Sequence, residues 1–202
     1  MKRLLLCASM LVLAAVPAAA QVAVQEAVAT IPAKLATYQV AIPALAPAAS
    51  GTDIVTIIGS ATKTIRVEHV ECNGTSTASA TIPVYIIKRS TADLTGTSTT
   101  PAILPMDSND GAATAVVNAY TANPGTLGTL TANVYVGMLN TVTTAATAVP
   151  PTPNFSVDFG GLNQKPITLR GVTQLMAISL NGVSATAGAS LNCTLRWTEA
   201  GY

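Results

Sequence analysis

The chain has 202 residues, with ten basic and nine acidic side chains and a formal net charge of +1. Charged residues make up only 9% of it, well below the roughly 25% of an ordinary soluble domain. This balance gives no electrostatic basis for binding nucleic acid or an anionic membrane. A surface of Thr, Ala, Ser and Gly instead favours an extracellular protein or close contact between identical subunits.

Residues 1–20 have the layout of a secretory signal peptide. Two basic residues precede an uncharged apolar run from Leu4 to Val16, and three alanines end at Ala20. The run is shorter than the roughly 20 residues that a membrane-spanning helix needs, so we expect no transmembrane span. Cleavage after Ala20 would direct the protein out of the cytoplasm; the alternative is a retained apolar segment that docks on a partner.

Residues 21–50 are rich in Ala, Val and Pro. Pro32, Pro43 and Pro47 exclude a long helix here. The segment is therefore predicted to be an extended arm that packs along its own domain or along a neighbouring subunit. The folded domain is expected to occupy residues 51–202.

From Asp53 onward the pattern is that of β-strands separated by turns. Short apolar or alternating runs are bounded by turn signals such as Asn73-Gly74 and Asn181-Gly182. The expected strands cover residues 53–58, 62–72, 81–89, 112–121, 130–139, 154–159, 166–171, 175–182 and 189–199. They predict an all-β fold, a jelly-roll-like antiparallel β-sandwich with an extended N-terminal arm.

Three of these strands carry further detail. In the strand at 62–72 the apolar positions change phase, which predicts a β-bulge near Glu68-His69. Pro83 indicates an edge strand or a position near a strand start. The last strand alternates, so one face is expected to hold Leu191, Cys193, Leu195 and Trp197.

Candidates for catalysis or metal binding are few. His69 is the only histidine, no Gly-x-Ser-x-Gly elbow accompanies it, and a regular strand points Glu68 to the opposite face. Residues 107–111 superficially resemble a calcium loop but lack the closing Glu and fit an Asx-type turn. Asp53 and Asp158 are isolated carboxylates. We therefore expect no catalytic residue, no metal and no cofactor, and a secreted hydrolase is the least favoured function.

Two cysteines follow the signal-like segment, Cys72 and Cys193. In an oxidising compartment they can pair, and closing so long a loop contributes ~4–5 kcal/mol in the chain-entropy model. The alternative, which the sequence leaves open, is two buried free thiols. Three Asn-x-Ser/Thr sequons, at Asn73, Asn154 and Asn192, matter only in a host that glycosylates.

Seven short motifs occur in order along the chain: SATKTIRV (60–67), KRSTAD (88–93), PMDS (105–108), AYTANPGTLGTL (119–130), PITLRG (166–171), LNG (180–182) and RWTE (196–199). Together they resemble tailed-phage virion structural proteins of the capsid-decoration or fibre type, over about residues 53–199. The resemblance implies a β-sandwich subunit of a particle and carries over no catalytic residue.

The sequence thus predicts a non-enzymatic structural protein, a surface subunit of a phage-type particle or filament. The alternative is a secreted, adhesin-like cell-surface or matrix binding module, which the signal-like segment favours. Expected partners are further copies of the chain and other particle subunits, but not nucleic acid. The Ser/Thr/Pro-rich stretches 90–111 and 140–153 are expected to be exposed loops, available to a surface receptor or glycan. The expected location is the virion surface, or the extracellular space after cleavage.

Overall fold

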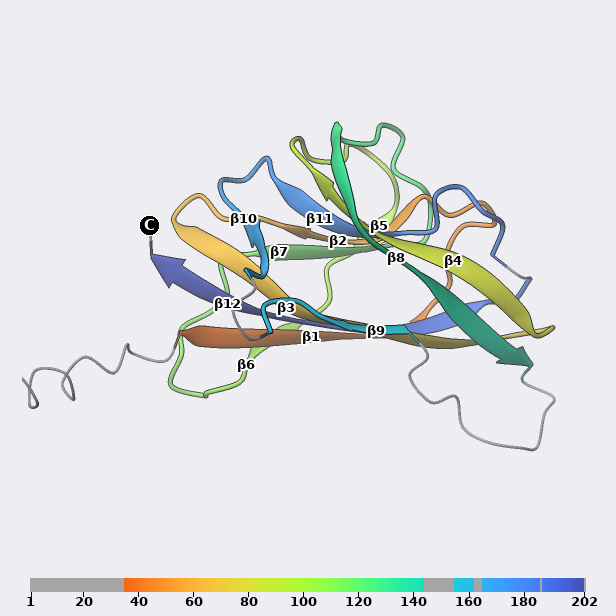
Figure 1. Cartoon of the computed structure of the whole chain (residues 1–202), viewed down its shortest axis with the longest axis horizontal. Helices are drawn as coiled ribbons and strands as arrows, with labels where there is room; N and C mark the ends of the chain where they lie inside the picture. The colour runs from red at the N-terminus through yellow and green to blue at the C-terminus, as the bar shows by residue number, and fades with distance from the viewer. Residues whose placement is uncertain (1–34, 144–154, 162–164, 186, 202) are drawn as a thin grey trace, which may run out of the picture. The chain divides into compact units, whose positions relative to one another are not determined.

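The computed structural model describes residues 35–143, 155–161, 165–185 and 187–201 (Figure 1). All regular elements in these ranges are strands, so the all-β prediction is confirmed. The signal-like segment and residues 21–34 of the predicted arm lie outside the described residues. The strands are β1 (Ala36–Leu45), β2 (Asp53–Ile58), β3 (Lys63–Ser76), β4 (Ala80–Arg89), β5 (Ser98–Thr99), β6 (Ile103–Pro105), β7 (Val116–Tyr120), β8 (Leu130–Thr143), β9 (Phe155–Asp158), β10 (Ile167–Leu169), β11 (Leu175–Ser179) and β12 (Ser190–Gly201).

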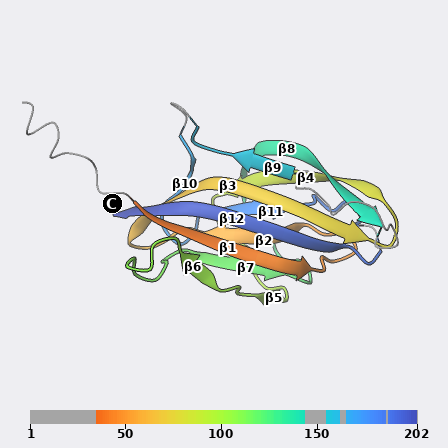
Figure 2. The ribbon, with the colours of Figure 1, turned by 90° about the horizontal axis from the view of Figure 1, so that it is seen from below.

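The strands form two layers that face each other across the core (Figures 1 and 2). In order of pairing, one layer is β6-β1-β12-β3 and the other is β5-β7-β2-β11-β4-β8. β8 connects them, because it pairs with β4 along most of its length and with β3 at Val142 and Thr143. That last pairing is parallel, whereas the other pairings of described strands are antiparallel. β10 and β9 line the same edge of β3.

The core lies between the layers, and the last strand supplies much of it. Leu191, Cys193, Leu195 and Trp197 are all buried, as their alternation predicted. The Trp197 ring is fully buried and stacks on Tyr38, with ring centroids 6.0 Å apart. Burying aromatic side chains of this size contributes roughly 2–3 kcal/mol each, so this pair is a main support of the first layer.

The predicted bulge in β3 is confirmed. Arg196 and Trp197 are adjacent in β12, yet they pair with His69 and Val67 of β3, so Glu68 is the extra residue. The change of phase brings Val70 into the core together with Val67. Without the bulge, one of these two apolar groups would face solvent.

The arm predicted to pack along its own domain does so over residues 36–45, and the compact domain extends before the predicted boundary at residue 51. Residues 36–45, expected to belong to the arm, form β1, which lies between β12 and β6. Pro43 is tolerated because the register of β1 with β12 is interrupted between Ile42 and Leu45. The compact domain therefore begins at Leu35.

The predictions for Pro83 and for the loops at 90–111 and 140–153 are confirmed only in part. β4 is an internal strand, but Pro83 precedes the stretch that pairs with β11, so its missing N–H leaves no gap in that ladder. The loop at 90–111 is largely exposed and contains β5 and β6. The second predicted loop, 140–153, is wrong at its start, because residues 140–143 continue β8; residues 144–153 lie outside the described residues.

A buried carboxylate attaches the segment before β7 to the last strand. The Glu199 carboxylate accepts hydrogen bonds of 2.7–3.2 Å from the N–H groups of Thr114 and Ala115, the Thr114 hydroxyl and the Trp197 indole. Lys63 lies 3.5 Å away as a cationic partner. Burial alone raises the pKa of Glu199, but these hydrogen bonds outweigh it and hold the pKa below the ordinary 4.5.

We expect Glu199→Gln to lower the free energy of unfolding by roughly 2–3 kcal/mol at neutral pH, because the amide accepts fewer of these bonds. Since the folded-state pKa of Glu199 is depressed, its contribution is present above about pH 4.5 and is lost as the pH falls through the folded-state value. Urea unfolding of both proteins measures the difference. Glu71→Gln, at a partly exposed carboxylate, is the control, and an equal loss in that variant would contradict the role of Glu199.

Candidate functional site

One long edge of β8 lacks a strand partner among the described residues. Its first edge pairs with β4 from Leu130 to Thr141. Its second edge meets β3 only at Val142 and Thr143. We call the second edge from Leu130 to Leu139 the open edge. A row of main-chain donors and acceptors of this kind is a template for another strand.

Several large apolar side chains along the open edge are exposed. Val136 and Met138 are 52% and 57% exposed and lie opposite Tyr85 and Pro83 of β4. Tyr135 points the other way and makes an edge contact with Phe155, with ring centroids 5.9 Å apart. The exposed apolar side chains of β8 are Leu130, Val134, Tyr135, Val136 and Met138. The alternation in this strand was visible in the sequence, but it could not tell which face meets the core.

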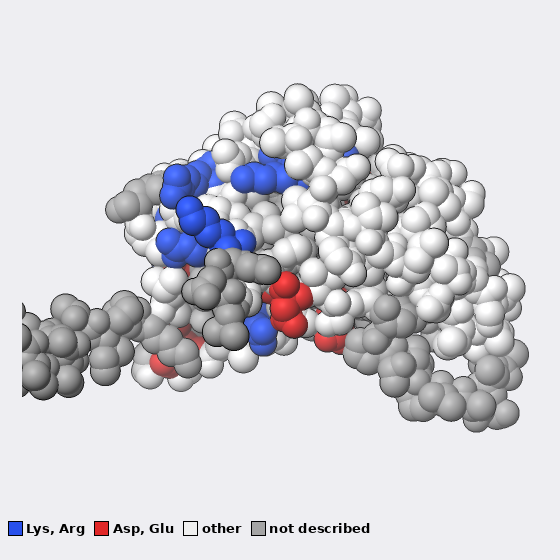
Figure 3. All heavy atoms as spheres, viewed as in Figure 1, with Lys and Arg blue, Asp and Glu red and all other residues white. Residues whose placement is uncertain are grey.

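No charge protects the open edge. Residues 112–142 contain no Lys, Arg, Asp or Glu. Figure 3 shows a wide area without charged side chains around β8, while the charges gather on the side near β10. Edge strands are normally protected by charges, prolines or bulges. β8 has register shifts near Thr131 and Val134, but its pairing with β4 is regular from Tyr135 onward. The open edge is therefore suited to accept a further strand.

A buried ionic cluster lies on the second layer. The Arg89 side chain is 7% exposed and binds both oxygens of the fully buried Asp53 carboxylate, at 2.7 and 2.9 Å. It also donates to the Gly128 carbonyl at 2.8 Å and lies 3.7 Å from Asp93. Gly128 donates back to Asp93 at 2.8 Å. A Cβ at Gly128 would collide with the Thr91 carbonyl oxygen, so the close approach requires glycine.

The cluster holds two carboxylates and one guanidinium, and their proximity shifts the pKa values of Arg89 and Asp93. The hydrogen bond from Arg89 to Asp53 raises the pKa of Arg89 and keeps it charged. Burial raises the pKa of Asp93 to about 6, the neighbouring Asp53 charge adds to the effect, and the Gly128 N–H opposes it. One Asp93 oxygen, Oδ2, has no hydrogen-bond partner within the described structure. We assign this cluster a structural role, because its side chains are closed to solvent.

His69 is placed between carboxylates rather than beside a nucleophile. Its Nδ1 lies 2.7 Å from Asp158 Oδ1, on the neighbouring strand β9, and its Nε2 lies 3.4 Å from Glu71. Both ring nitrogens are thus taken by acids. The described residues hold no group of three or more His, Cys, Asp or Glu arranged to hold a metal ion.

The calcium-like sequence at 107–111 is a turn. Asp107 Oδ1 accepts hydrogen bonds from the main chain and side chain of Asn109, at 2.9 and 3.0 Å. This is the Asx-type turn that the sequence favoured. The turn lies near the first layer, because the Tyr38 hydroxyl donates to the Gly111 carbonyl at 2.9 Å.

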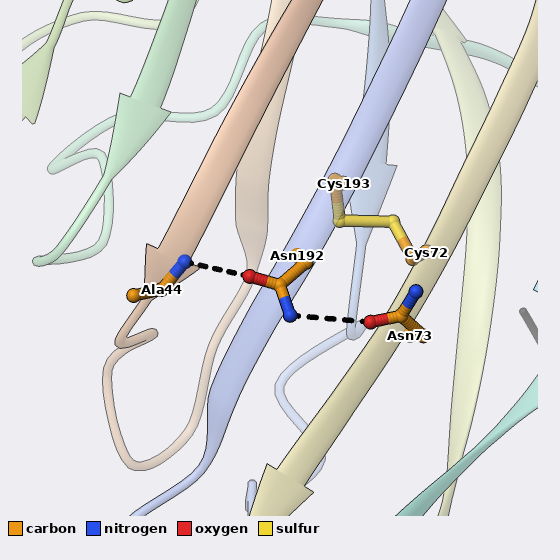
Figure 4. Close-up of a disulfide and its surroundings, with 5 residues drawn as sticks. All are labelled: Ala44, Cys72, Asn73, Asn192 and Cys193. Carbon is orange, nitrogen blue, oxygen red and sulfur yellow. Dashed lines mark hydrogen bonds between the residues drawn. A yellow bond between two sulfur atoms is a disulfide. The ribbon is translucent and has the colours of Figure 1, made fainter. Parts of the chain in front are cut away.

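The cysteine pair that the sequence left open is a disulfide in the structure. Cys72 and Cys193 face each other in the β3–β12 pairing, with Cα atoms 4.2 Å apart. Beside the bridge, the Asn192 amide joins three strands, since it donates to Asn73 Oδ1 and accepts from the Ala44 N–H (Figure 4). The asparagine side chains of two of the three sequons, Asn73 and Asn192, therefore take part in hydrogen bonds between strands. The third, Asn154, lies outside the described residues.

Comparison with protein families, curated proteins and solved structures found no match to this chain. Within the described ranges, no helix is long and apolar enough to cross a membrane.

We expect Asp93→Asn to remove a pH dependence of stability. Because the folded-state pKa of Asp93 is about 6 and its ordinary value is 3.8, the folded protein holds a proton that the unfolded chain releases. The contribution of Asp93 to stability should therefore fall by roughly 1–3 kcal/mol as the pH rises between these values, and stay level above them.

Urea unfolding over a pH series checks this. In the Asp93→Asn variant the amide oxygen can still accept the Gly128 hydrogen bond, so the variant should fold and be the more stable protein above pH 6. Asp107→Asn, in the exposed turn, serves as the control and should keep the wild-type slope. Parallel curves for wild type and Asp93→Asn would refute the assignment.

Proposed function

We propose that this protein is a non-enzymatic structural subunit that assembles with copies of itself on the surface of a phage-type particle or filament. The observation that carries the proposal is the open edge of β8. Its exposed apolar side chains and its regular main chain from Tyr135 to Leu139 suit a partner strand better than bulk water.

A second copy of the chain suits this edge by symmetry. Two β8 strands placed antiparallel across a two-fold axis would present identical apolar rows and would exchange main-chain hydrogen bonds. The edge carries no charge that would repel its own copy. Outward-facing Val136 and Met138 would then become central in the joined sheet.

The motifs that resemble virion structural proteins support the particle setting. They occupy strand ends, turns and the buried clusters of the domain rather than a catalytic arrangement. His69 has both nitrogens occupied by carboxylates, so it is poorly placed to act as a general base. These features favour a jelly-roll-like subunit whose exposed loop at 90–111 faces outward and is available to a receptor or glycan.

Val136→Lys should weaken the self-association, because it places like charges on the joined strands of both copies. We expect wild-type protein to sediment as a dimer or larger species. The variant should associate at least tenfold more weakly, a change of about 1.4 kcal/mol.

Val172→Lys is the matched control. Val172 is 57% exposed but lies in the turn before β11, away from the open edge. It should leave sedimentation unchanged. A wild-type protein that remains monomeric at high concentration, or a Val136→Lys variant that assembles normally, would contradict the proposal.

A specific observation favours the second candidate, a secreted adhesin-like binding module. The Cys72–Cys193 disulfide joins two central strands and is the kind of bond that persists in oxidising compartments. Thiol labelling of the protein from its natural source, unfolded without reductant, should detect neither cysteine. Labelling of both would remove this support. Reduction should lower the free energy of unfolding by roughly 3–5 kcal/mol, measured by urea unfolding with and without reductant.

A further inference from the structure

A pocket lined by basic side chains lies apart from the uncharged open edge. It has a volume of about 300 Å³ and is lined by Lys88, Lys165, Thr168, Arg170 and Gln174. We call these five residues the basic pocket. Three of them are cationic and none is acidic. Figure 3 shows Lys and Arg side chains gathered on this side of the molecule, around the position of β10 in Figure 1.

The walls of the pocket are held by hydrogen bonds between strands. Lys88 is half-buried on β4, and its Nζ donates to the Thr168 carbonyl of β10 at 2.7 Å. The turn after β10 is closed by a bond from the Arg170 N–H to Gln174 Oε1 at 3.0 Å. These contacts fix the Lys88 ammonium group and the turn that carries Arg170 around one hollow. The main-chain frame of the pocket therefore belongs to the folded domain.

The positive charge of the pocket is not neutralised by the described part of the chain. Among the described residues, the ion pairs involve Lys63, His69 and Arg89, and none involves a lysine or arginine of the pocket. A second hollow offers the contrast. It is lined by Arg196 together with Glu68 and Asp158, so its cation has acids beside it.

Cations without acids attract anions, and this arrangement has the groups to hold one. A guanidinium binds two oxygens of a phosphate, sulfate or carboxylate in a fixed geometry, while ammonium groups act as point charges. The Gln174 amide adds a neutral N–H donor, since its oxygen already accepts from the Arg170 N–H. Arg66, opposite Thr168 in the β3–β10 pairing, adds a further positive charge nearby. The volume exceeds that of a single inorganic ion and suits a small, multiply charged ligand.

We propose that the basic pocket binds a multiply charged oxyanion, the chemistry shared by phosphorylated, sulfated and polycarboxylated sugars. This site differs from the loops at 90–111 and 140–153 that the sequence favoured for ligand binding. It is also independent of self-association, because it uses none of the residues of the open edge.

Calorimetric titration of the full chain with inorganic pyrophosphate tests the proposal. The titration is run at about 10 mM ionic strength, where screening acts only beyond roughly 30 Å. We expect saturable binding at one site, and at least a tenfold loss of affinity in the double variant Lys165→Gln, Arg170→Gln, which lacks two charge-assisted contacts. Both side chains are exposed, so an unchanged urea midpoint will show that the double variant folds.

Arg196→Gln is the matched control, since it removes one positive charge from the other hollow. It should bind pyrophosphate within about twofold of wild type. Parallel titrations with sulfate and citrate identify which oxyanion the pocket prefers, and site-specific binding of any of the three supports the proposal. It is overturned if none of the three binds saturably, or if Arg196→Gln loses as much affinity as the double variant, because the attraction is then diffuse.

Discussion

The buried guanidinium of Arg89 holds two loop segments against the outer face of the second layer. Arg89 joins Asp53 of β2 to two loop segments, through the Gly128 carbonyl and the Asp93 carboxylate. The same segments pair at Leu94 and Thr126, and they lie beside a small outer cluster formed by Ile87, Leu175 and Ala177 with Ala92 against it. Because an unpaired Arg89 would cost several kcal/mol, the loops are held at that position. The two loop segments do not cover β8, whose apolar side chains are exposed.

Three of the seven motifs from which the sequence predicts a phage-type subunit supply buried polar contacts of the domain. KRSTAD supplies Arg89 and Asp93, and AYTANPGTLGTL supplies the Gly128 that binds both. RWTE supplies Trp197 and Glu199, which are bonded to each other. In a chain with so few charges, a buried ion tolerates little substitution, because its partners are fixed in number and geometry. Such motifs carry information on how the domain closes, which is why they point to a fold without pointing to a reaction.

Local patterns were sufficient for much of this fold, and their limits have physical causes. The alternation in the last strand and the phase change around Glu68 report directly on which side chains avoid water, so both predictions hold. The arm predicted over residues 21–50 includes β1, but Pro43 obscured its place inside the sheet, where a register interruption accommodates that proline. The exposure of Val136 and Met138 could not be predicted, because it depends on which strand lies beside β8. The Arg89 cluster and the basic pocket likewise join residues that are distant in sequence.

The disulfide has a consequence for a protein exposed to proteases. Cys72 and Cys193 are separated by 121 positions, and the exposed loop at 90–111 lies inside that interval. Loop tips of this kind are the usual points of proteolytic nicking. A single cut there leaves two fragments joined both by the sheet and by one covalent bond between β3 and β12. The domain is therefore organised so that damage to an outer loop opens the chain without releasing a piece of it.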